Sequence, residues 1–259
     1  GRALEKLFEA APGQLDVTIF NAEPRVNYDR IMLSPVLSGE KSYEDIVIHG
    51  DAWYMKNGVT LHKGAKVAKI DRATHTVTSE NGIVAKYDKL IIATGSSPVI
   101  IPVPGHRLPG VLTYRDLDDV HAMLVAAKAG GKAVVIGGGL LGLEAANGLM
   151  KKGMQVTVVH LMDVLMERQL DSEAAALLRK SLEERGMKFA MGGRTEEILG
   201  EGGRVSGVKL ADGTILPAQL VVMAIGIKPN VDIARRAGIH CDRGIVVDDT
   251  MLSYDGRIY

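Results

Sequence analysis

Cysteine is almost absent from the 259 residues, and Cys241 is the single one. One thiol cannot form an intrachain disulfide, and so sparing a use of cysteine is typical of a reducing compartment. We therefore expect a cytoplasmic protein. Because Cys241 lies between a predicted helix and a predicted strand, we interpret it as structural or incidental.

Neither sign of charge is in excess, since 31 Lys and Arg residues balance 31 Asp and Glu residues. A neutral chain has no overall field that draws it to nucleic acid or anionic lipid, so we expect small ligands. The longest apolar runs, such as Leu220 to Ile225, are far shorter than the roughly 20 residues that span a bilayer. The charged residues of segment 1–11 are spaced like a solvated helix face, which argues against a signal peptide. We expect neither nucleic acid nor a membrane among the partners.

Two stretches of the chain repeat one pattern. Short alternating strands are joined by glycine turns, at Asn81-Gly82 in the first stretch and at Gly202-Gly203 and Asp212-Gly213 in the second. Each stretch then ends in an apolar run closed by glycine, Tyr87 to Gly95 and Leu220 to Gly226. With 46% hydrophobic and 24% charged residues, the composition is that of a folded protein large enough for two domains. We therefore predict an α/β protein with two similar nucleotide-binding domains, each a parallel sheet with a small antiparallel meander.

A proline-rich segment from Pro98 to Gly110, followed by a helix over 116–129, is expected to cross between the domains. The alternative is a long surface loop inside one domain. The chain opens with a predicted helix over 2–9 and a strand over 17–20. Because such α/β domains normally begin with a buried strand, we expect the first strand to precede Gly1.

A glycine-rich turn follows the predicted strand 133–136 and precedes a predicted helix 143–152 and a strand 156–160. The whole unit has about the 30 residues of a dinucleotide-binding unit. Gly137 permits the tight turn, Gly139 lets the backbone approach a pyrophosphate, and Gly142 lets the helix pack on the strand, with Leu140 and Leu141 between them. The helix N-terminus would then present N–H groups to the phosphates.

The second strand of such a unit usually ends in an acidic residue that holds a ribose, but here it ends in His160. A neutral His160 could bond a ribose hydroxyl, and a cationic one could accept a 2′-phosphate. The third interpretation is a surface histidine without a cofactor role. The choice between NADH and NADPH stays open.

Three segments in order resemble the signatures of flavoproteins with two dinucleotide-binding domains, of the pyridine nucleotide-disulfide oxidoreductase type. Tyr87 to Gly95 resembles their Ala-Thr-Gly signature, Gly137 to Ala145 their NAD(P)H fingerprint, and Ala224 to Asn230 their return to the flavin domain. Glu23 to Ser34 and Val159 to Asp171 further resemble the large subunit of assimilatory NAD(P)H-dependent nitrite reductase. The single cysteine excludes the paired thiols of a flavoprotein disulfide reductase within these residues.

The resemblance implies two Rossmann-like three-layer (β/β/α) domains, with the NAD(P) domain inserted in the FAD domain. The expected borders are 1–108 and 225–259 for FAD and 109–224 for NAD(P)H. The flavin domain's own glycine fingerprint would precede Gly1, and the motif over the ribityl phosphate would follow Tyr259. For the chain alone we therefore predict weak or no FAD retention, while NAD(P)H binding survives.

The resemblance also assigns cofactor-binding residues. Glu23 would hold the FAD adenosine ribose, Arg30 and Ser34 would lie by the flavin, and Val67 would cover its adenine. Glu144 would face the nicotinamide. The remaining expected cofactor-binding residues are Ala93, Thr94, Gly95, Gly137, Gly139, Leu140, Leu141, Gly142, His160 and Gly226.

Structural explanations stand beside these assignments. Glu23 and Arg30 could be in an exposed ion pair, and the helix dipole alone could explain a carboxylate at Glu144. We expect no metal site and no catalytic side chain, because hydride transfer between two positioned rings requires no acid, base or nucleophile.

By resemblance, the chain passes hydride from NAD(P)H to FAD, which feeds an iron–sulfur cluster and sirohaem that reduce nitrite to ammonia. Those centres need cysteine ligands and would lie in another region or subunit, the electron-accepting partner. One alternative is a stand-alone reductase for ferredoxin, rubredoxin or dioxygen, although related ferredoxin reductases have lysine after the Leu-Ser pair where this chain has Pro35. A second is a non-catalytic module that binds nicotinamide nucleotide. A homodimer stays open.

Overall fold

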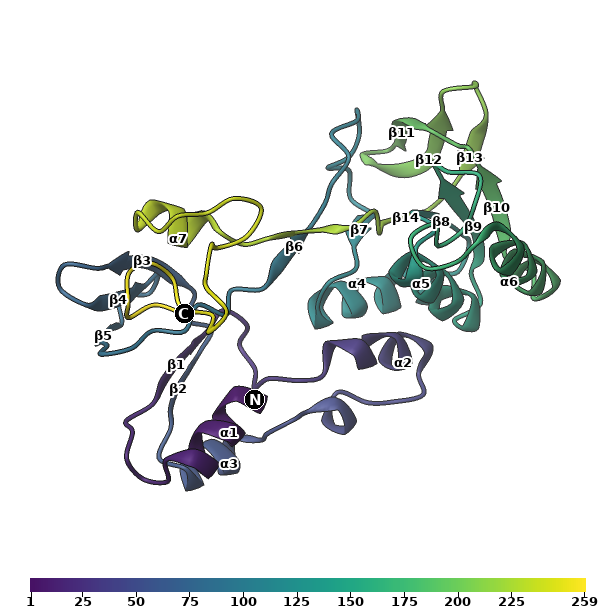
Figure 1. The fold of residues 1–259 in the computed structure, drawn as a ribbon. Helices are drawn as coiled ribbons and strands as arrows, with labels where there is room; N and C mark the ends of the chain where they lie inside the picture. The colour runs from purple at the N-terminus through teal and green to yellow at the C-terminus, as the bar shows by residue number, and fades with distance from the viewer. The chain divides into compact units, whose positions relative to one another are not determined.

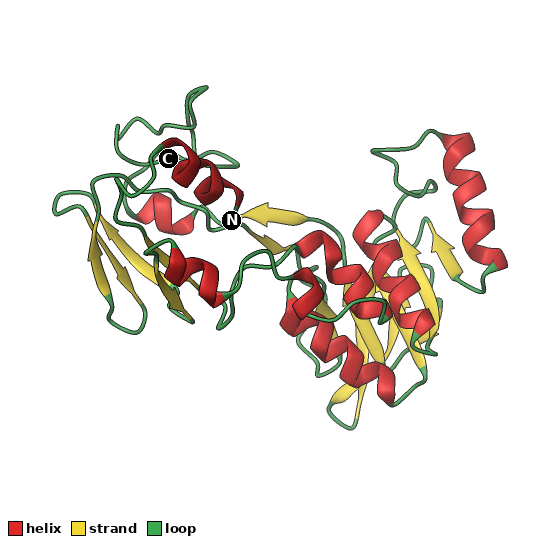
Figure 2. Ribbon diagram, turned by 90° about the horizontal axis from the view of Figure 1, so that it is seen from below, coloured by secondary structure: helices red, strands yellow, loops and turns green.

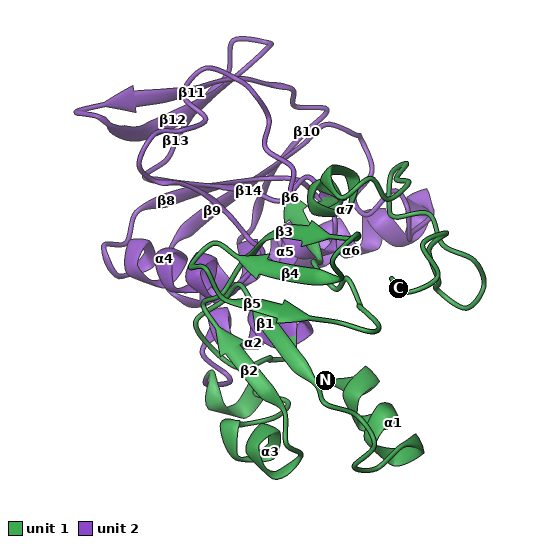
Figure 3. Ribbon diagram, turned by 90° about the vertical axis from the view of Figure 1, so that its left-hand side faces the viewer, with its two compact units in different colours: residues 1–29, 43–97, 228–259 green, residues 30–42, 98–227 purple.

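The computed structural model describes residues 1–259, and their contacts divide the chain into two compact units. Unit 1 comprises residues 1–29, 43–97 and 228–259, and unit 2 comprises residues 30–42 and 98–227 (Figure 3). The helices are α1 (Arg2–Ala10), α2 (Leu33–Ser38), α3 (Asp51–Lys56), α4 (Leu117–Lys128), α5 (Leu140–Lys151), α6 (Ser172–Glu184) and α7 (Asp232–Arg236), with 3-10 turns at η1 (Arg30–Met32) and η2 (Glu44–Ile46) (Figure 1, Figure 2). None of them is long and apolar enough to cross a membrane.

Unit 2 is built on a parallel sheet of five strands in the order β10-β9-β8-β14-β7. Their bounds are β7 (Val111–Thr113), β8 (Lys132–Ile136), β9 (Gln155–His160), β10 (Lys188–Met191) and β14 (Leu220–Met223). The two central strands are buried on both faces, which explains why their sequences are continuous apolar runs. Helices α4 and α5 pack against this sheet.

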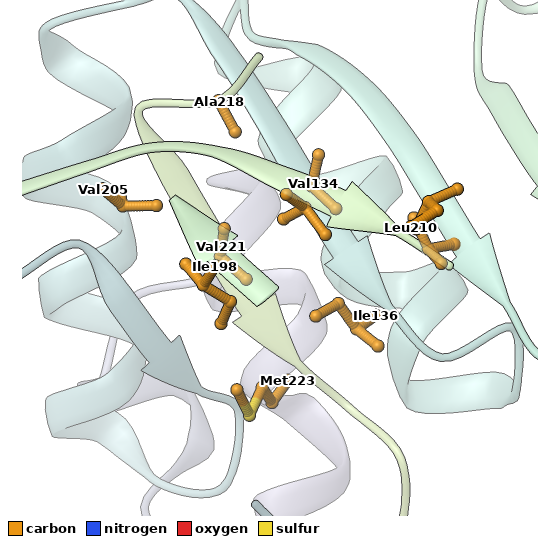
Figure 4. Packing of buried hydrophobic residues seen from close by; sticks show 10 residues of the cluster. Val134, Ile136, Ile198, Val205, Leu210, Ala218, Val221 and Met223 are labelled. Atoms are coloured by element: carbon orange, nitrogen blue, oxygen red, sulfur yellow. The ribbon is translucent and has the colours of Figure 1, made fainter. Parts of the chain in front are cut away.

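An antiparallel meander, β11 (Thr195–Glu201), β12 (Arg204–Leu210) and β13 (Ile215–Pro217), forms the third layer of unit 2. Val134 and Ile136 of β8 pack with Val221 and Met223 of β14 and with Ile198 of the meander (Figure 4). Each of these side chains is at most 4% exposed, and burial of an aliphatic side chain contributes roughly 1.5–3 kcal/mol. The expected three-layer arrangement of meander, sheet and helices is confirmed.

Helix α2 packs on α4 and α5 and therefore belongs to unit 2. Leu37 is fully buried, and its side chain lies where any side chain at Gly148 of α5 would stand. The contact borders of the units, 97/98 and 227/228, differ from the sequence-based borders at 108/109 and 224/225. They also separate segment 30–42 from the first FAD segment in which the sequence placed it. The assignment of cofactors to the segments stays a prediction.

Unit 1 contains a parallel pair, β1 (Thr18–Asn21) and β2 (Thr60–Lys63), and an antiparallel meander of β3 (Val67–Asp71), β4 (Thr76–Ser79) and β5 (Val84–Lys86). The Asn81-Gly82 turn is confirmed, because Gly82 has φ +85° and the Ser79 N–H donates to the Ile83 carbonyl. The run from Tyr87 to Gly95 contains no strand, and only an isolated parallel bridge links Leu90 to Ile258. The short strands β6 (Ser96–Pro98) and β15 (Ile227–Pro229) pair with each other.

Two apolar clusters hold unit 1 together. One joins the β3–β5 meander to α7 through Ile70, Val77 and Ile233. Cys241 packs at its edge and donates to the Ile239 carbonyl, in agreement with a structural role. The other cluster surrounds Tyr54.

Candidate nucleotide-binding site

The carboxyl ends of the parallel strands of unit 2 define the candidate site. From β8 the chain moves through α5 to β9 and β10 on one side, while β14 and β7 lie on the other side. The order of strands therefore reverses between β8 and β14, and open α/β sheets bind ligands outside the strand ends at such a switch point. Gly137 follows β8 directly, and Gly226 lies just after β14.

Two glycines of the 137–142 turn are required by close backbone contacts. Gly137 has φ +123°, and a Cβ there would stand 2.3 Å from the Ala224 carbonyl oxygen. A Cβ at Gly142 would stand 1.9 Å from the Gly137 carbonyl oxygen. The turn and the start of α5 are thus packed so tightly that only glycine fits, as the sequence predicted for both positions.

Gly139 differs, because a Cβ built there would meet no atom within 4 Å. It is the N-cap residue of α5, and no side chain caps this helix. The first turn of α5 contains no acidic residue, whereas α4 is capped by Asp116 and α6 by Asp171. No side chain therefore compensates the partial positive charge at the start of α5, and there is open space beside its N-cap residue, which suits a phosphate group.

Large apolar side chains line the same edge of the sheet. They follow β8, β9 and β14, and each is between 38% and 62% exposed: Leu140, Leu141, Leu161, Met162 and Ile225. Exposed apolar residues gathered beside polar backbone groups are typical of a ligand-binding surface. The edge could thus contact the flat rings of a nucleotide as well as its phosphates.

His160 is 8% exposed, so it is not a surface histidine. Its Nδ1 accepts a hydrogen bond of 3.0 Å from the Gly138 N–H. The neutral ring that accepts at Nδ1 has its proton on Nε2, which lies 3.1 Å from the Val164 carbonyl and 3.2 Å from a Glu167 carboxylate oxygen. The side chain that the sequence proposed for a ribose is thus bonded to the glycine turn.

The segment after β9 also holds this turn. The Met166 N–H donates to the Gly138 carbonyl, and Leu165 is buried beside Gly138. Met166 has φ +51°, a conformation that is uncommon for a residue with a side chain. Both backbone groups of Gly138 are therefore bonded within the protein, which leaves the neighbouring Gly139 as the open position.

A chain of hydrogen bonds joins Ser34, Tyr114 and Glu144 on the other side of the switch point. The Ser34 hydroxyl donates to a Glu144 carboxylate oxygen at 2.7 Å and lies 2.9 Å from the Tyr114 hydroxyl. Tyr114 is 5% exposed, and burial raises the pKa of its hydroxyl to about 12. Because Ser34 has only one proton to give, Tyr114 donates to Ser34 and Ser34 donates to Glu144.

Asp119 is hydrogen-bonded to the residues on both sides of Tyr114. Its carboxylate accepts from the Thr113 hydroxyl at 3.0 Å and from the Arg115 N–H at 2.6 Å. Burial, with the nearby Asp116 charge, raises the pKa of Asp119. The Arg115 carbonyl accepts from Arg30 at 2.9 Å. Arg30, which the sequence had placed by the flavin, is thus hydrogen-bonded to the residue that follows Tyr114.

The residues expected around FAD in unit 1 are partly exposed. Ala93, Thr94 and Gly95 are exposed, and Thr94 is braced by hydrogen bonds to and from Asn230. Val67 is half-buried in β3. The Glu23 carboxylate accepts from Tyr28 at 2.9 Å and pairs with Arg25 at 3.3 Å, so it is partly engaged within the protein.

Of the residues that the sequence assigned to cofactors, unit 2 contains Arg30, Ser34, Gly137 to Gly142, Glu144, His160 and Gly226. Glu23, Val67 and Ala93 to Gly95 lie in unit 1. Sequence reasoning missed Tyr114, Asp119 and Met166. Tyr114 had one sequence signal, because it follows a short apolar stretch that forms a strand of the same sheet.

The chain is similar to known proteins over its whole length. Residues 3–259 match the family model described as pyridine nucleotide-disulphide oxidoreductase. The chain is 46% identical over 258 residues to "Nitrite reductase [NAD(P)H]" and 43% identical over 258 residues to "Assimilatory nitrate reductase electron transfer subunit", both of Bacillus subtilis (strain 168). All of this chain is covered in both comparisons, but only 32% and 33% of those proteins, so the chain spans about a third of their length.

Among solved structures, a ferredoxin reductase from Rhodopseudomonas palustris matches 97% of this chain and 62% of its own, with a TM-score of 0.91 and 31% identity. This likeness confirms the predicted α/β fold of FAD- and NAD(P)-binding oxidoreductases. Family membership implies FAD and NAD(P)H as cofactors. The chain belongs to the pyridine nucleotide-disulphide oxidoreductase family.

Proposed function

We propose that unit 2 binds NAD(P)H with its pyrophosphate at Gly139 and the N-terminus of α5. The observation that carries this proposal is the contrast within one unit: α4 and α6 have aspartate caps, whereas α5 begins uncapped, without acidic residues and in front of open space. A diphosphate would supply the negative charge that α5 lacks. In this proposal His160 acts by holding Gly138 in place.

The two ends of the nucleotide then lie on opposite sides of the switch point. In such units the adenosine ribose binds at the end of the second strand, here β9. The nicotinamide end therefore extends toward β14 and β7, where Glu144 and Gly226 lie. Leu161 and Met162 at the β9 end would contact the adenosine half.

We further propose that Glu23, Val67 and the exposed residues 93–95 contribute to an FAD site in unit 1. FAD, when bound, supplies what no side chain can, the acceptance of hydride and the release of single electrons. The residues of this chain bind and orient the cofactors and exclude water. The exposed backbone at Ala93 to Gly95 suits close approach of a cofactor.

For the gene product that contains this chain, we propose the delivery of electrons from NAD(P)H to an accepting centre that reduces nitrite to ammonia. The names of the two Bacillus subtilis relatives support a role in nitrite or nitrate reduction. The acceptor, an iron–sulfur cluster and sirohaem, would lie outside these residues, because only one cysteine is present here.

The test uses the gene product, loaded with FAD, in an assay of NADH oxidation. Oxidation that depends on nitrite, with ammonia as the product, supports the proposal. Oxidation that depends on an added ferredoxin and not on nitrite would favour a carrier reductase, the activity in the name of the Rhodopseudomonas palustris structure. If NADH binds but leaves the flavin oxidised, the chain is a non-catalytic module.

A further inference from the structure

We propose that Tyr114, through Ser34, positions the Glu144 carboxylate for the nicotinamide half of the bound nucleotide. The inference rests on the proposed NAD(P)H site and adds to it a residue with no function so far. Tyr114 does not itself need to touch the nucleotide. It is a positioning residue at the end of β7, on the side of the sheet opposite to the adenosine strand β9.

The direction of the hydrogen bonds is fixed at both ends. Tyr114 is almost fully buried and keeps its proton, so its hydroxyl is a donor. A carboxylate accepts only, so Glu144 must receive the proton of Ser34. Donation from Tyr114 satisfies the Ser34 oxygen and polarises its hydroxyl, which strengthens the bond to Glu144.

We call the hydrogen-bonded residues Tyr114, Ser34 and Glu144 the relay. Each of the three lies on a backbone segment that is itself held in place. Asp119 bonds the residues on both sides of Tyr114. Ser34 lies in α2, which is fastened to α5 by the burial of Leu37 against Gly148. Glu144 lies on α5, one turn after the glycine turn. The carboxylate orientation is therefore set by hydrogen bonds between rigid elements.

The Ser34 bond occupies one oxygen of the Glu144 carboxylate, Oε2, and the side chain remains partly exposed. Oε1 can then accept from a ligand N–H, and the carboxamide of nicotinamide offers such donors. A positioned acceptor binds better than a mobile one because it loses less rotamer freedom on binding. Loss of the relay should weaken binding of the whole nucleotide but not of its ADP-ribose part.

The experiment is calorimetric titration of the full chain with NADH and with ADP-ribose, which lacks the nicotinamide. We expect S34A to weaken NADH binding about five- to ten-fold and Y114F about two- to five-fold, the size of one hydrogen bond. S34A/Y114F should bind NADH no more weakly than S34A, because both changes break one chain of bonds. S34T keeps the hydroxyl and should bind NADH like the unchanged chain.

ADP-ribose should bind all variants within about two-fold of the unchanged chain. Y87F is the matched control, because it removes a buried hydroxyl without a hydrogen-bond partner from unit 1. Equal weakening of NADH and ADP-ribose, multiplied losses in S34A/Y114F, or unchanged NADH binding in S34A would overturn the relay. If the unchanged chain binds ADP-ribose, the proposed nucleotide site is supported even when the variants contradict the relay. If the unchanged chain binds neither NADH nor ADP-ribose, the proposed function itself is wrong.

Discussion

Three glycine-to-alanine changes separate the packing role of the glycine turn from its binding role. Gly142 and Gly139 are three residues apart, yet their surroundings are opposite. A Cβ at Gly142 would be 1.9 Å from the Gly137 carbonyl oxygen, whereas ordinary contact begins at 3.4 Å, so backbone must move by about 1.5 Å. Overpacking of this kind costs about 1–3 kcal/mol.

For a domain of 150–250 residues each kcal/mol corresponds to about 2–4 °C, so we expect G142A to lower the Tm by roughly 2–12 °C. Gly139 has φ −81° and ψ 178°, which alanine adopts freely, and open space lies in front of it. G139A should therefore unfold within about 1 kcal/mol of the unchanged chain, since loss of a glycine cap and reduced freedom of the unfolded chain offset each other.

G139A should affect NADH binding much more than it affects stability. Its methyl group would occupy the space in front of the α5 N-terminus, and we expect NADH to bind at least about ten-fold more weakly. The control is G50A, because Gly50 is also an N-cap with φ −79° and no atom within 4 Å of a Cβ. Differential scanning calorimetry and NADH titration of the three variants test the reasoning. G139A that binds NADH as tightly as G50A would refute it.

Further predictions concern the glycine turn, the cap of α6 and the stability at acidic pH. H160L leaves the buried Gly138 N–H without an acceptor, so it should lower the free energy of unfolding in urea by about 1–3 kcal/mol and weaken NADH binding. H160N retains an acceptor near the Nδ1 position and should recover much of the stability and of the NADH affinity. Equal losses of stability and affinity in the two variants would exclude the hydrogen bond as the cause. D171A removes the hydrogen bond to the Ala174 N–H that caps α6, so it should lower the free energy of unfolding by about 0.5–2 kcal/mol and leave NADH binding unchanged. Coincident unfolding curves of D171A and the unchanged chain would show that the cap contributes nothing to stability. Lys69 and backbone N–H groups lower the pKa of Asp71 from 3.8 to about 2, so the contribution of Asp71 to stability is complete above pH 3.8 and is lost as the pH falls toward 2. D71N should therefore reduce the dependence of the free energy of unfolding on pH between these two values. An unaltered pH dependence in D71N would contradict the assignment.

Much of the fold follows from local sequence patterns. The glycine turn between two apolar strands predicted β8, α5 and β9 to within a few residues, because tight turns and buried strands leave strong local signals. The meander β3–β5 was likewise marked by Asn81-Gly82. Segment 30–42 was harder, since its place beside α5 depends on a long-range contact between Leu37 and Gly148 that no periodicity reveals.

The candidate site was predictable where backbone geometry dictates the residue and not where side chains compete for partners. The tight turn at Gly137 and the close packing at Gly142 could be predicted because only glycine fits at either position. The role of His160 could not, because its inward turn toward Gly138 depends on the segment that follows β9. Tyr114 escaped notice because its partners Ser34 and Glu144 are 80 and 30 residues away in the sequence.

The central claim is that backbone amides at the start of α5 bind the diphosphate of NAD(P)H. Amide chemical shifts of the full chain, followed by NMR during titration with NADH, test it most directly. We expect saturable shifts concentrated at Gly139, Leu140 and Leu141. Saturable binding that leaves these three amides unperturbed, or no binding to a folded sample, would contradict the claim.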